Sequence, residues 1–226
     1  MKIKFVVATR VSEEKFWTDT ATGRSLSLYR FPFLEVLLSA NNKEGLPKIY
    51  NRSIESSIQD PAILIFAHDD IHLTDFYWVD QVVNALNHFQ LVGLAGNKRR
   101  LPNQPAWAFI NRQFDWDHSE NLSGLVGHGK GFPPKNLSFY GPPAQPVKLL
   151  DGVMLSTHSD TLKDSSIRFD EQFDFHFYDM DFCRSFESKG LAMGTWPISL
   201  VHESGGAFGS EGWDNALQKY LAKWGD

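Results

Sequence analysis

Two adjacent carboxylates with a histidine on either side follow a short apolar run in this sequence. The apolar run is Ala62–Ala67, and the polar residues are His68, Asp69, Asp70 and His72. Such a run is typical of a parallel strand covered on both faces, and open α/β sheets bind ligands beyond the carboxyl ends of their strands. Because Mg²⁺ and Mn²⁺ prefer carboxylate oxygens and Mg²⁺ sites often include substrate phosphates, the pattern predicts a divalent cation and a diphosphate here. In the alternative interpretation, one aspartate only caps the helix that follows.

A second acidic stretch, Phe169–Cys183, alternates carboxylates with aromatic residues and then enters a predicted helix. Acidic residues near a helix N-terminus are favoured by the helix dipole, which would explain Asp179 and Asp181 without any chemistry. A carboxyl among aromatic neighbours can instead have a raised pKa and act as a general base on a hydroxyl. Asp179 stands at the junction of loop and helix and is the better placed of the two for that role.

Three further groups could serve the same site. His202 follows the last predicted strand, where a neutral imidazole could complete a metal site begun by Asp70, although a lone histidine is more often structural. Gly205-Gly206 would let the backbone approach a phosphate closely, or form a mobile turn. The basic run Lys98–Arg100 follows another predicted strand and could pair with phosphate, or lie on a solvated surface.

Composition and motifs exclude several classes of protein. The net charge of −5 argues against a duplex nucleic-acid binder. Cys183 is the only cysteine, so an internal disulfide and a multi-thiolate zinc site are excluded. We find no P-loop, no dinucleotide-binding glycine fingerprint after the first strand and no Gly-x-Ser-x-Gly elbow. No stretch approaches the roughly 18 to 20 apolar residues of a membrane span, so we expect a soluble, cytoplasmic protein.

Apolar runs and helical periodicity predict an alternation of strands and helices. The expected strands are Phe5–Thr9, Phe33–Ser39, Ala62–Ala67, Leu91–Gly96, Val147–Ser156 and Met193–Val201. The expected helices are Lys48–Ser57, one capped by Thr74 with Val79, Val82, Val83 and Leu86 on its buried face, Tyr178–Lys189, and a C-terminal one with Ala216, Leu217, Tyr220, Leu221 and Trp224 on one face. This order favours βαβ units, and so an α/β fold with a mainly parallel sheet.

The length of 226 residues suits one domain with an insertion. We expect residues 1–100 and residues 147–226 to form the two halves of this domain. Residues 101–146 between them are rich in proline and glycine and are expected to be loop or short antiparallel strand. Trp107 and Trp116 in this insertion could form an acceptor platform or lid, although core packing is the ordinary fate of a tryptophan.

In their order and spacing, these motifs resemble the inverting, nucleotide-sugar-dependent glycosyltransferases of family 2 with the GT-A fold. The resemblance is strongest to the branch whose acidic motif reads His-Asp-Asp-Ile, and it extends from about Phe33 to Gly206. Its elements are Asn41-Asn42 with Tyr50-Asn51, His68–Ile71 after its strand, Leu150–Gly152 followed by Phe169–Glu171, and Tyr178–Phe182 followed by His202.

The resemblance implies that residues 1–100 form a nucleotide-binding half and residues 147–226 an acceptor-binding and catalytic half. It also implies a role for each motif. Asp70 and His202 would hold Mn²⁺ or Mg²⁺, and Asp179 would be the catalytic base. Donor binding would fall to Thr9, Arg10, Asn41, Asn42, Asn51, His68, Asp69, Lys98 and Asp151. The chain departs from the family pattern at Tyr178, where many relatives have glutamate, and at His68, where many have aspartate.

By this resemblance the protein is expected to transfer a sugar from a nucleotide diphosphate donor, with a UDP-sugar expected first, to a hydroxyl of a glycan or lipid-linked acceptor in glycan or polysaccharide synthesis. A nucleotidyltransferase is the alternative enzyme, but it would be expected to carry a glycine-rich phosphate loop after the first strand. A catalytically silent domain that binds a nucleotide sugar or a partner is the third possibility. The C-terminal helix could also touch a membrane surface.

Overall fold

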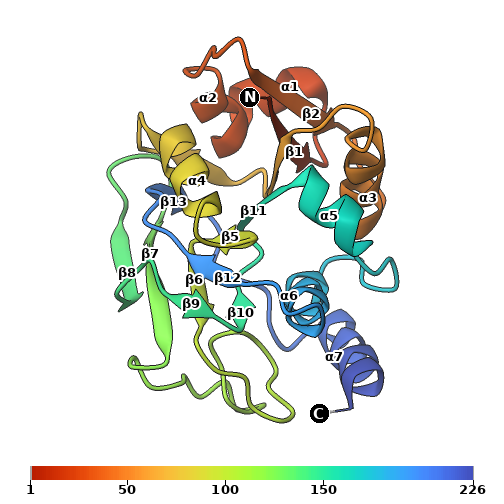
Figure 1. The fold of residues 1–226 in the computed structure, drawn as a ribbon. Coiled ribbons are helices and arrows are strands. Elements are labelled where there is room, and N and C mark those ends of the chain that lie inside the picture. Colours follow the sequence, from red (N-terminus) through yellow and green to blue (C-terminus); the bar gives the residue numbers. More distant parts are fainter. Residues whose placement is uncertain (1, 226) are drawn as a thin grey trace.

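The computed structural model describes residues 2–225, which form an α/β fold with two sheets (Figure 1). The strands are β1 Ile3–Ala8, β2 Leu34–Ser39, β3 Ile63–Ala67, β4 Ile71–Leu73, β5 Leu91–Gly93, β6 Ala95–Asn97, β7 Leu122–His128, β8 Asn136–Gly141, β9 Pro146–Val147, β10 Leu149–Leu150, β11 Met154–His158, β12 Met193–Thr195 and β13 Leu200–His202. The helices are α1 Glu13–Asp19, α2 Ala21–Leu26, α3 Leu46–Ser56, α4 Trp78–Leu86, α5 Ser159–Ser165, α6 Tyr178–Ser188 and α7 Glu211–Trp224.

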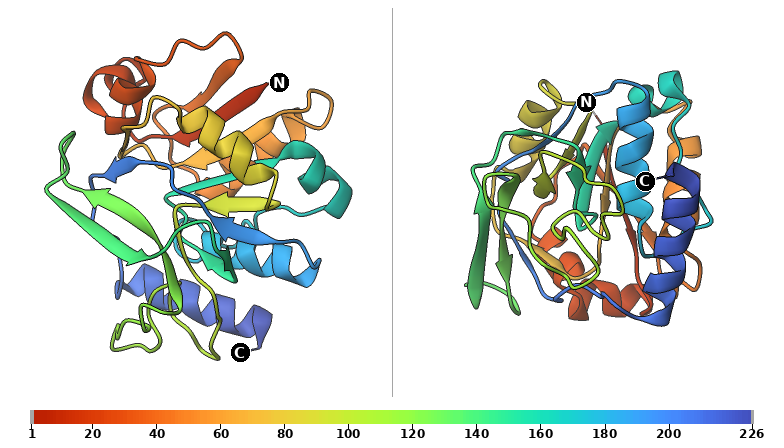
Figure 2. Two further views of the ribbon diagram at one scale, coloured as in Figure 1. Left: turned by 60° about the vertical axis from the view of Figure 1, so that its left-hand side comes forward. Right: turned by 90° about the horizontal axis from the view of Figure 1, so that it is seen from below.

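The larger sheet has the strand order β2-β1-β3-β11-β5-β12-β9. Strands β2, β1, β3, β5 and β12 run in one direction, and β11 and β9 run in the other. The predicted mainly parallel sheet is therefore confirmed, with β11 as an antiparallel strand at its centre. Helices α3, α5 and α6 lie on one side of this sheet, and α4 and the smaller sheet lie on the other (Figures 1 and 2).

The smaller sheet, ordered β10-β6-β7-β13-β4 with β8 beside β7, explains why three predicted strands are shorter than expected. The predicted strand Leu91–Gly96 divides into β5 and β6, and Met193–Val201 divides into β12 and β13, so each contributes to both sheets. Val147–Ser156 divides into three short strands. The chain passes from β9 in the larger sheet to β10 in the smaller one, and a turn at Asp151, whose carboxylate accepts the Val153 N–H, separates β10 from β11. These breaks join the two sheets along one edge.

Elements outside the predicted set also appear. The segment between β1 and β2 forms the short helices α1 and α2, where we had assigned no structure, and Ser12 and Thr20 cap them. Residues 122–141 form the antiparallel hairpin β7–β8, one of the two structures expected for the insertion. Thr74 does not cap α4, because residues 71–73 pair with β13 as strand β4, the Thr74 N–H donates to Ser199, and the helix begins only at Trp78.

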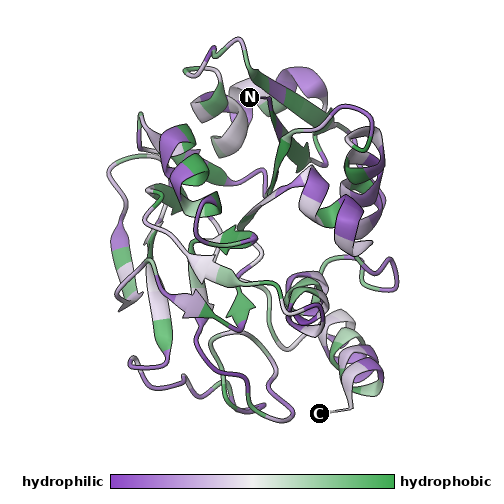
Figure 3. Ribbon diagram, viewed as in Figure 1, coloured by the Kyte–Doolittle hydropathy of each residue, from purple (hydrophilic) through white to green (hydrophobic). Residues whose placement is uncertain are grey.

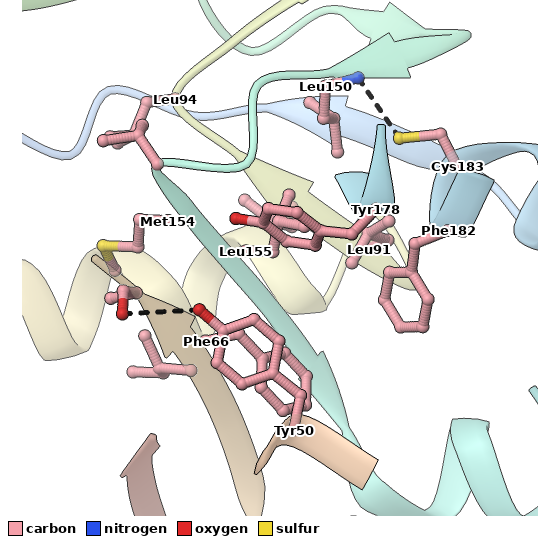
Figure 4. Packing of buried hydrophobic residues seen from close by; sticks show 14 of the residues in the cluster. Tyr50, Phe66, Leu91, Leu94, Leu150, Met154, Leu155, Tyr178, Phe182 and Cys183 are labelled. Carbon is pink, nitrogen blue, oxygen red and sulfur yellow. Dashed lines mark hydrogen bonds between the residues drawn. The ribbon is translucent and has the colours of Figure 1, made fainter. Parts of the chain in front are cut away.

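The core lies on both faces of the larger sheet, and β1 and β3 are buried along their whole length. Figure 3 shows hydrophobic residues concentrated on the strands of this sheet and hydrophilic ones on the outer sides of α3 and α5. Under α3 and α6, the rings of Tyr50 and Phe66 pack with centroids 4.9 Å apart (Figure 4). Cys183 is buried in the same cluster, and its Sγ accepts a hydrogen bond from the Leu150 N–H.

Helix α7 packs its apolar face against the rest of the molecule, burying Trp213, Leu217 and Tyr220. Its last turn is held by Lys223, which pairs with the buried Asp181 at 2.7 Å, and by Trp224, whose Nε1 donates to the same carboxylate. Asp181 is thus used structurally, as the simpler interpretation of its position had it. Among residues 2–225, no helix is both long enough and apolar enough to cross a bilayer.

Candidate active site

A cavity of about 640 Å³ opens beyond the carboxyl end of β3, and the main candidates for metal binding and catalysis line it. Its lining includes His68, Asp70 and Asp151, together with Asp179 and His202. These residues come from four places in the chain: the loop after β3, the turn between β10 and β11, the first turn of α6 and the end of β13. The cavity therefore lies where the strand-end rule predicts a ligand site, at the point where the two sheets meet.

His68, Asp70 and His202 form a group that could hold a metal ion, because one ligand atom from each lies within 4.8 Å of the others. Pairing of β13 with β4 sets Ile71 opposite His202, and the Glu203 N–H donates to the Asp70 carbonyl. The register of this short ladder brings the histidine to the aspartate, at 3.3 Å between Nε2 and Oδ1.

The donor set fits a divalent cation. Asp70 Oδ1 is buried and accepts no hydrogen bond, although His68 Nδ1 lies 3.9 Å away on its other side. A buried carboxylate oxygen without a donor is costly unless a cation neutralises it. Two imidazole nitrogens and one carboxylate suit a first-row transition metal such as Mn²⁺ better than Mg²⁺, which prefers oxygen ligands.

Asp70 and His202 shift each other's pKa. Burial by itself would raise the pKa of Asp70, but the nearby imidazole of His202, 3.3 Å away, outweighs it and holds that pKa well below its usual range. Burial would likewise lower the pKa of His202, and Asp70 reverses this and raises it. The pKa of His68 is lowered, chiefly by burial, so its imidazole is neutral at neutral pH. Asp70 therefore stays ionised, as a metal ligand must.

Tyr178 fixes the tautomer of His68. The Tyr178 hydroxyl lies 3.0 Å from His68 Nε2 and donates its single proton to the Gly152 carbonyl at 2.8 Å. Tyr178 must then accept from His68, so Nε2 carries the proton of the neutral imidazole. Nδ1 is left with a free lone pair, 3.9 Å from Asp70. His68 therefore belongs to the metal group, and not only to the residues predicted to bind the nucleotide sugar.

Asp179 lies close to the metal group but is held by different partners. Its two oxygens accept the N–H groups of Gly152 and Met180, each at 2.9 Å. Burial, reinforced by the charge of Asp151, raises the pKa of Asp179 to about 7. A carboxylate with this pKa can take a proton at neutral pH far more readily than an ordinary aspartate.

Gly152 allows this arrangement because a side chain there would not fit. A Cβ at this position would lie 2.5 Å from the Tyr178 hydroxyl and 2.9 Å from the Asp179 Cβ. On the other side of the same turn, Asp151 accepts the Trp107 Nε1–H at 3.0 Å. The turn therefore holds Tyr178, Asp179 and Trp107 together.

The sequence of the chain is also similar to that of a known protein family. The model of a family described as "Glycosyltransferase like family" matches residues 33–203. The chain belongs to this glycosyltransferase family. Among curated proteins, none matches the sequence.

Two solved structures share the fold of this glycosyltransferase. The crystal structure of GalNAc-T7 with UDP, GalNAc and Mn²⁺ has a TM-score of 0.57 and 8% identity, over 100% of this chain and 48% of the other. The mannosyltransferase PcManGT from Pyrobaculum calidifontis, in complex with GDP-Man and Mn²⁺, has a TM-score of 0.53 and 11% identity, over 98% of this chain and 63% of the other. This chain spans less than two thirds of either protein. The expected GT-A fold is confirmed.

Several predicted donor-binding residues of the glycosyltransferase gather at the ends of β1 and β2. Thr9 is buried and donates to Asp69 Oδ2 at 2.6 Å, which orients a carboxylate on the cavity wall. Arg10 follows it and is exposed. The Asn41 and Asn42 N–H groups donate to Val11 and Thr9, so they tie the two strand ends together. Asp69 alone among these lines the cavity.

Two other predicted donor-binding residues do not line the cavity. Asn51, in α3, exchanges hydrogen bonds with both backbone groups of Phe169 and so anchors the loop before α6. Lys98 donates to the Glu120 carbonyl in the insertion. Sequence reasoning missed the contact between Tyr178 and His68, for which the only signal was that both residues depart from the family pattern.

Proposed function

We propose that this glycosyltransferase moves a sugar from a nucleoside diphosphate donor, with UDP-sugars expected first, to an acceptor hydroxyl with inversion. The observation that carries the proposal is that the group of His68, Asp70 and His202 shares one cavity with Asp179, whose pKa is raised to about 7. The ligands of the two structural neighbours, UDP or GDP-Man with Mn²⁺, support a diphosphate donor and Mn²⁺.

The metal would be held by Asp70, His202 and His68. When bound, such a cation offsets the negative charge that develops on a departing diphosphate. Among residues 2–225, the cavity lining includes no lysine or arginine. Because no side chain of that kind is available to pair with the diphosphate in the cavity, donor binding is expected to depend strongly on the cation.

Asp179 would act on the acceptor. It accepts the proton of the acceptor hydroxyl while that oxygen forms a bond to the anomeric carbon and the bond to the diphosphate oxygen breaks. The N–H groups of Gly152 and Met180 fix the carboxylate during this step. One displacement from the face opposite the leaving group needs one base and inverts the anomeric configuration.

The remaining residues would bind or position the nucleotide-sugar donor. Asp69, oriented by Thr9, lies beside the metal group and would face the ribose or sugar. Arg10, Asn41 and Asn42 would form the nucleotide side, and Asp151 would face the transferred sugar. Asn51 and Lys98 would act only through the loops that they hold, since backbone groups of Phe169 and Glu120 already engage their side chains.

Calorimetric titration of UDP, GDP and CMP, with Mn²⁺ and then with EDTA, tests this function on the wild type and on Asp70→Ala. We expect UDP binding that requires Mn²⁺ and is lost in the variant, followed by hydrolysis of a UDP-sugar in a screen of donors. Asp170→Ala, which removes an acidic residue outside the cavity, is the matched control and should bind as the wild type does. Binding of no nucleotide would overturn the transferase proposal in favour of a partner-binding domain, and release of diphosphate from a nucleoside triphosphate would favour a nucleotidyltransferase.

A further inference from the structure

The cavity of the proposed active site has a second, aromatic part. Five rings form what we call the aromatic wall: Trp107, Phe109, Trp116, Tyr140 and Phe208. Trp107 contacts Tyr140 at a centroid distance of 5.0 Å, Phe109 lies 5.0 Å from Trp116, and Phe208 lies 5.1 Å from Phe109. Trp107, Phe109 and Trp116 lie between β6 and β7, Tyr140 lies in β8, and Phe208 lies in the loop before α7. Residues far apart in the sequence therefore build one continuous surface.

Two rings of the aromatic wall remain open to solvent. Trp116 is 54% exposed and Phe208 is 44% exposed, whereas Trp107 and Phe109 are buried. Tyr140 stacks on Trp116 at 5.7 Å and 19°, so it covers one face of the indole and the exposed area lies on the rest of the ring. Exposed aromatic side chains in a cavity lose unfavourable contact with water when a ligand covers them.

The aromatic wall is connected to the proposed base. Trp107 donates to Asp151, and the next residue, Gly152, donates its N–H to Asp179. A molecule lying on the aromatic wall is therefore in the same cavity as Asp179. The residues that contact Trp107 and Asp179, Asp151 and Gly152, are neighbours in one turn. This is the position that an acceptor needs if one of its hydroxyls is to reach the base.

The charges around the aromatic wall select against an anionic ligand. The cavity is lined by the carboxyl groups of Asp69, Asp70, Asp151 and Asp179 and, within the described residues, by no lysine or arginine. A uronate or phosphate group on the wall would meet negative charge and find no partner.

We propose that the aromatic wall is the acceptor subsite and that it binds a neutral sugar ring, with Trp116 and Phe208 as the stacking residues. The electron-rich face of an aromatic ring attracts the C–H groups on one face of a pyranose, while hydroxyls at the ring edge remain free to reach Asp179. The substrate class is thus a neutral glycan. A prenyl phosphate on the wall would bring its phosphate to the side of Trp107 that contacts the Asp151 carboxylate. The inference rests on the proposed function, since it names the acceptor of that same site.

Titration of whole-chain protein, in the presence of UDP and Mn²⁺, tests the proposal. The probes are the neutral trisaccharides cellotriose, maltotriose and chitotriose, and the anionic trigalacturonate, followed by saturation-transfer NMR and calorimetry. We expect at least one neutral probe to bind, and trigalacturonate to bind at least about tenfold more weakly. Trp116→Ala and Phe208→Ala should each raise the Kd of the neutral probe by about tenfold.

Matched variants show whether the loss is specific. Phe76→Ala removes an aromatic side chain that is 76% exposed but outside the cavity, and should leave the Kd of the neutral probe unchanged. Trp116→Phe keeps a stacking face and should recover part of the binding lost in Trp116→Ala. Each variant must bind UDP with Mn²⁺ as the wild type does, which also shows that it is folded.

Three results would overturn the inference: equal binding of trigalacturonate, an unchanged Kd in both alanine variants, or no binding of any neutral probe up to about 10 mM while UDP binds. Failure of the proposed function has a different result, because UDP would then not bind to the wild type. Titrations of the same neutral probes without nucleotide would still report on the aromatic wall in that case.

Discussion

Replacing Asp179 with asparagine is expected to raise stability at pH 8 while it removes the proposed base. Burial and the charge of Asp151 raise the pKa of Asp179 from 3.8 to about 7. A difference of one pKa unit corresponds to about 1.4 kcal/mol, so the ionised carboxylate costs the folded state about 4 kcal/mol at pH 8. Because the folded pKa is the higher one, this cost develops as the pH rises from about 4 to 7 and is small below that window. Asparagine carries no such cost at any pH.

The substitution also removes a hydrogen bond. The two carboxylate oxygens accept from Gly152 and Met180, and an asparagine has only one accepting oxygen. One buried N–H loses its partner, at a cost of about 1–3 kcal/mol that does not depend on pH. We therefore expect the variant to match the wild type near pH 5 and to exceed its stability by about 2 kcal/mol at pH 8.

Denaturant unfolding of both proteins at several pH values between 5 and 8, with EDTA to remove metal, measures this difference. Asp117→Asn is the matched control, because hydrogen bonds from Arg99, Asn97 and Asn121 outweigh burial and hold the pKa of Asp117 below its usual range. Loss of that carboxylate should destabilise the protein by a similar amount across the whole pH range. The reasoning is refuted if Asp179→Asn also gives a free-energy difference that stays constant with pH.

Three further predictions concern activity and metal binding. Because a base must be ionised, hydrolysis of the donor should fall as the pH drops through about 7, and a limb near pH 4 in the pH–rate profile would contradict the assignment of Asp179. Tyr178→Phe removes the acceptor that holds His68 and should weaken Mn²⁺ binding by about tenfold, seen by electron paramagnetic resonance titration, whereas unchanged affinity would argue against this contact. Gly152→Ala should lower the melting temperature and the donor hydrolysis rate together, because its Cβ would meet Tyr178 at 2.5 Å; a fully active, equally stable variant would disprove the requirement for glycine.

The sequence was most informative where burial and chemistry coincide. The run Ala62–Ala67 is apolar throughout, so it could only be a strand covered on both faces, and its carboxyl end marked the cavity. The helix at Tyr178 could also be predicted, because acidic residues are favoured in a first helical turn and Gly190 ends the segment. The breaks at Leu94 and at Trp196-Pro197 could not, since apolar residues continue across them and the transfer from one sheet to the other depends on long-range pairing.

Polar residues at strand ends were harder to assign. Asp70, His202 and Asp179 were placed together correctly, since each follows or begins a regular element at the same edge of the fold. Asn51 and Lys98 have the same kinds of side chain, but local backbone groups satisfy them. Sequence spacing gives no means of telling a side chain that faces a cavity from one that closes its own loop.

The metal group depends on β4, a strand of only three residues. His68 and Asp70 follow β3 of the larger sheet, whereas His202 ends β13 of the smaller one, so neither sheet alone brings the three side chains together. The three residues of β4 make this connection, because Ile71 pairs with His202 immediately after Asp70. A shift of this pairing by one residue would turn His202 to the opposite face of the sheet and away from Asp70. The register of β4 against β13 is therefore as necessary to the proposed metal chemistry as the ligands themselves.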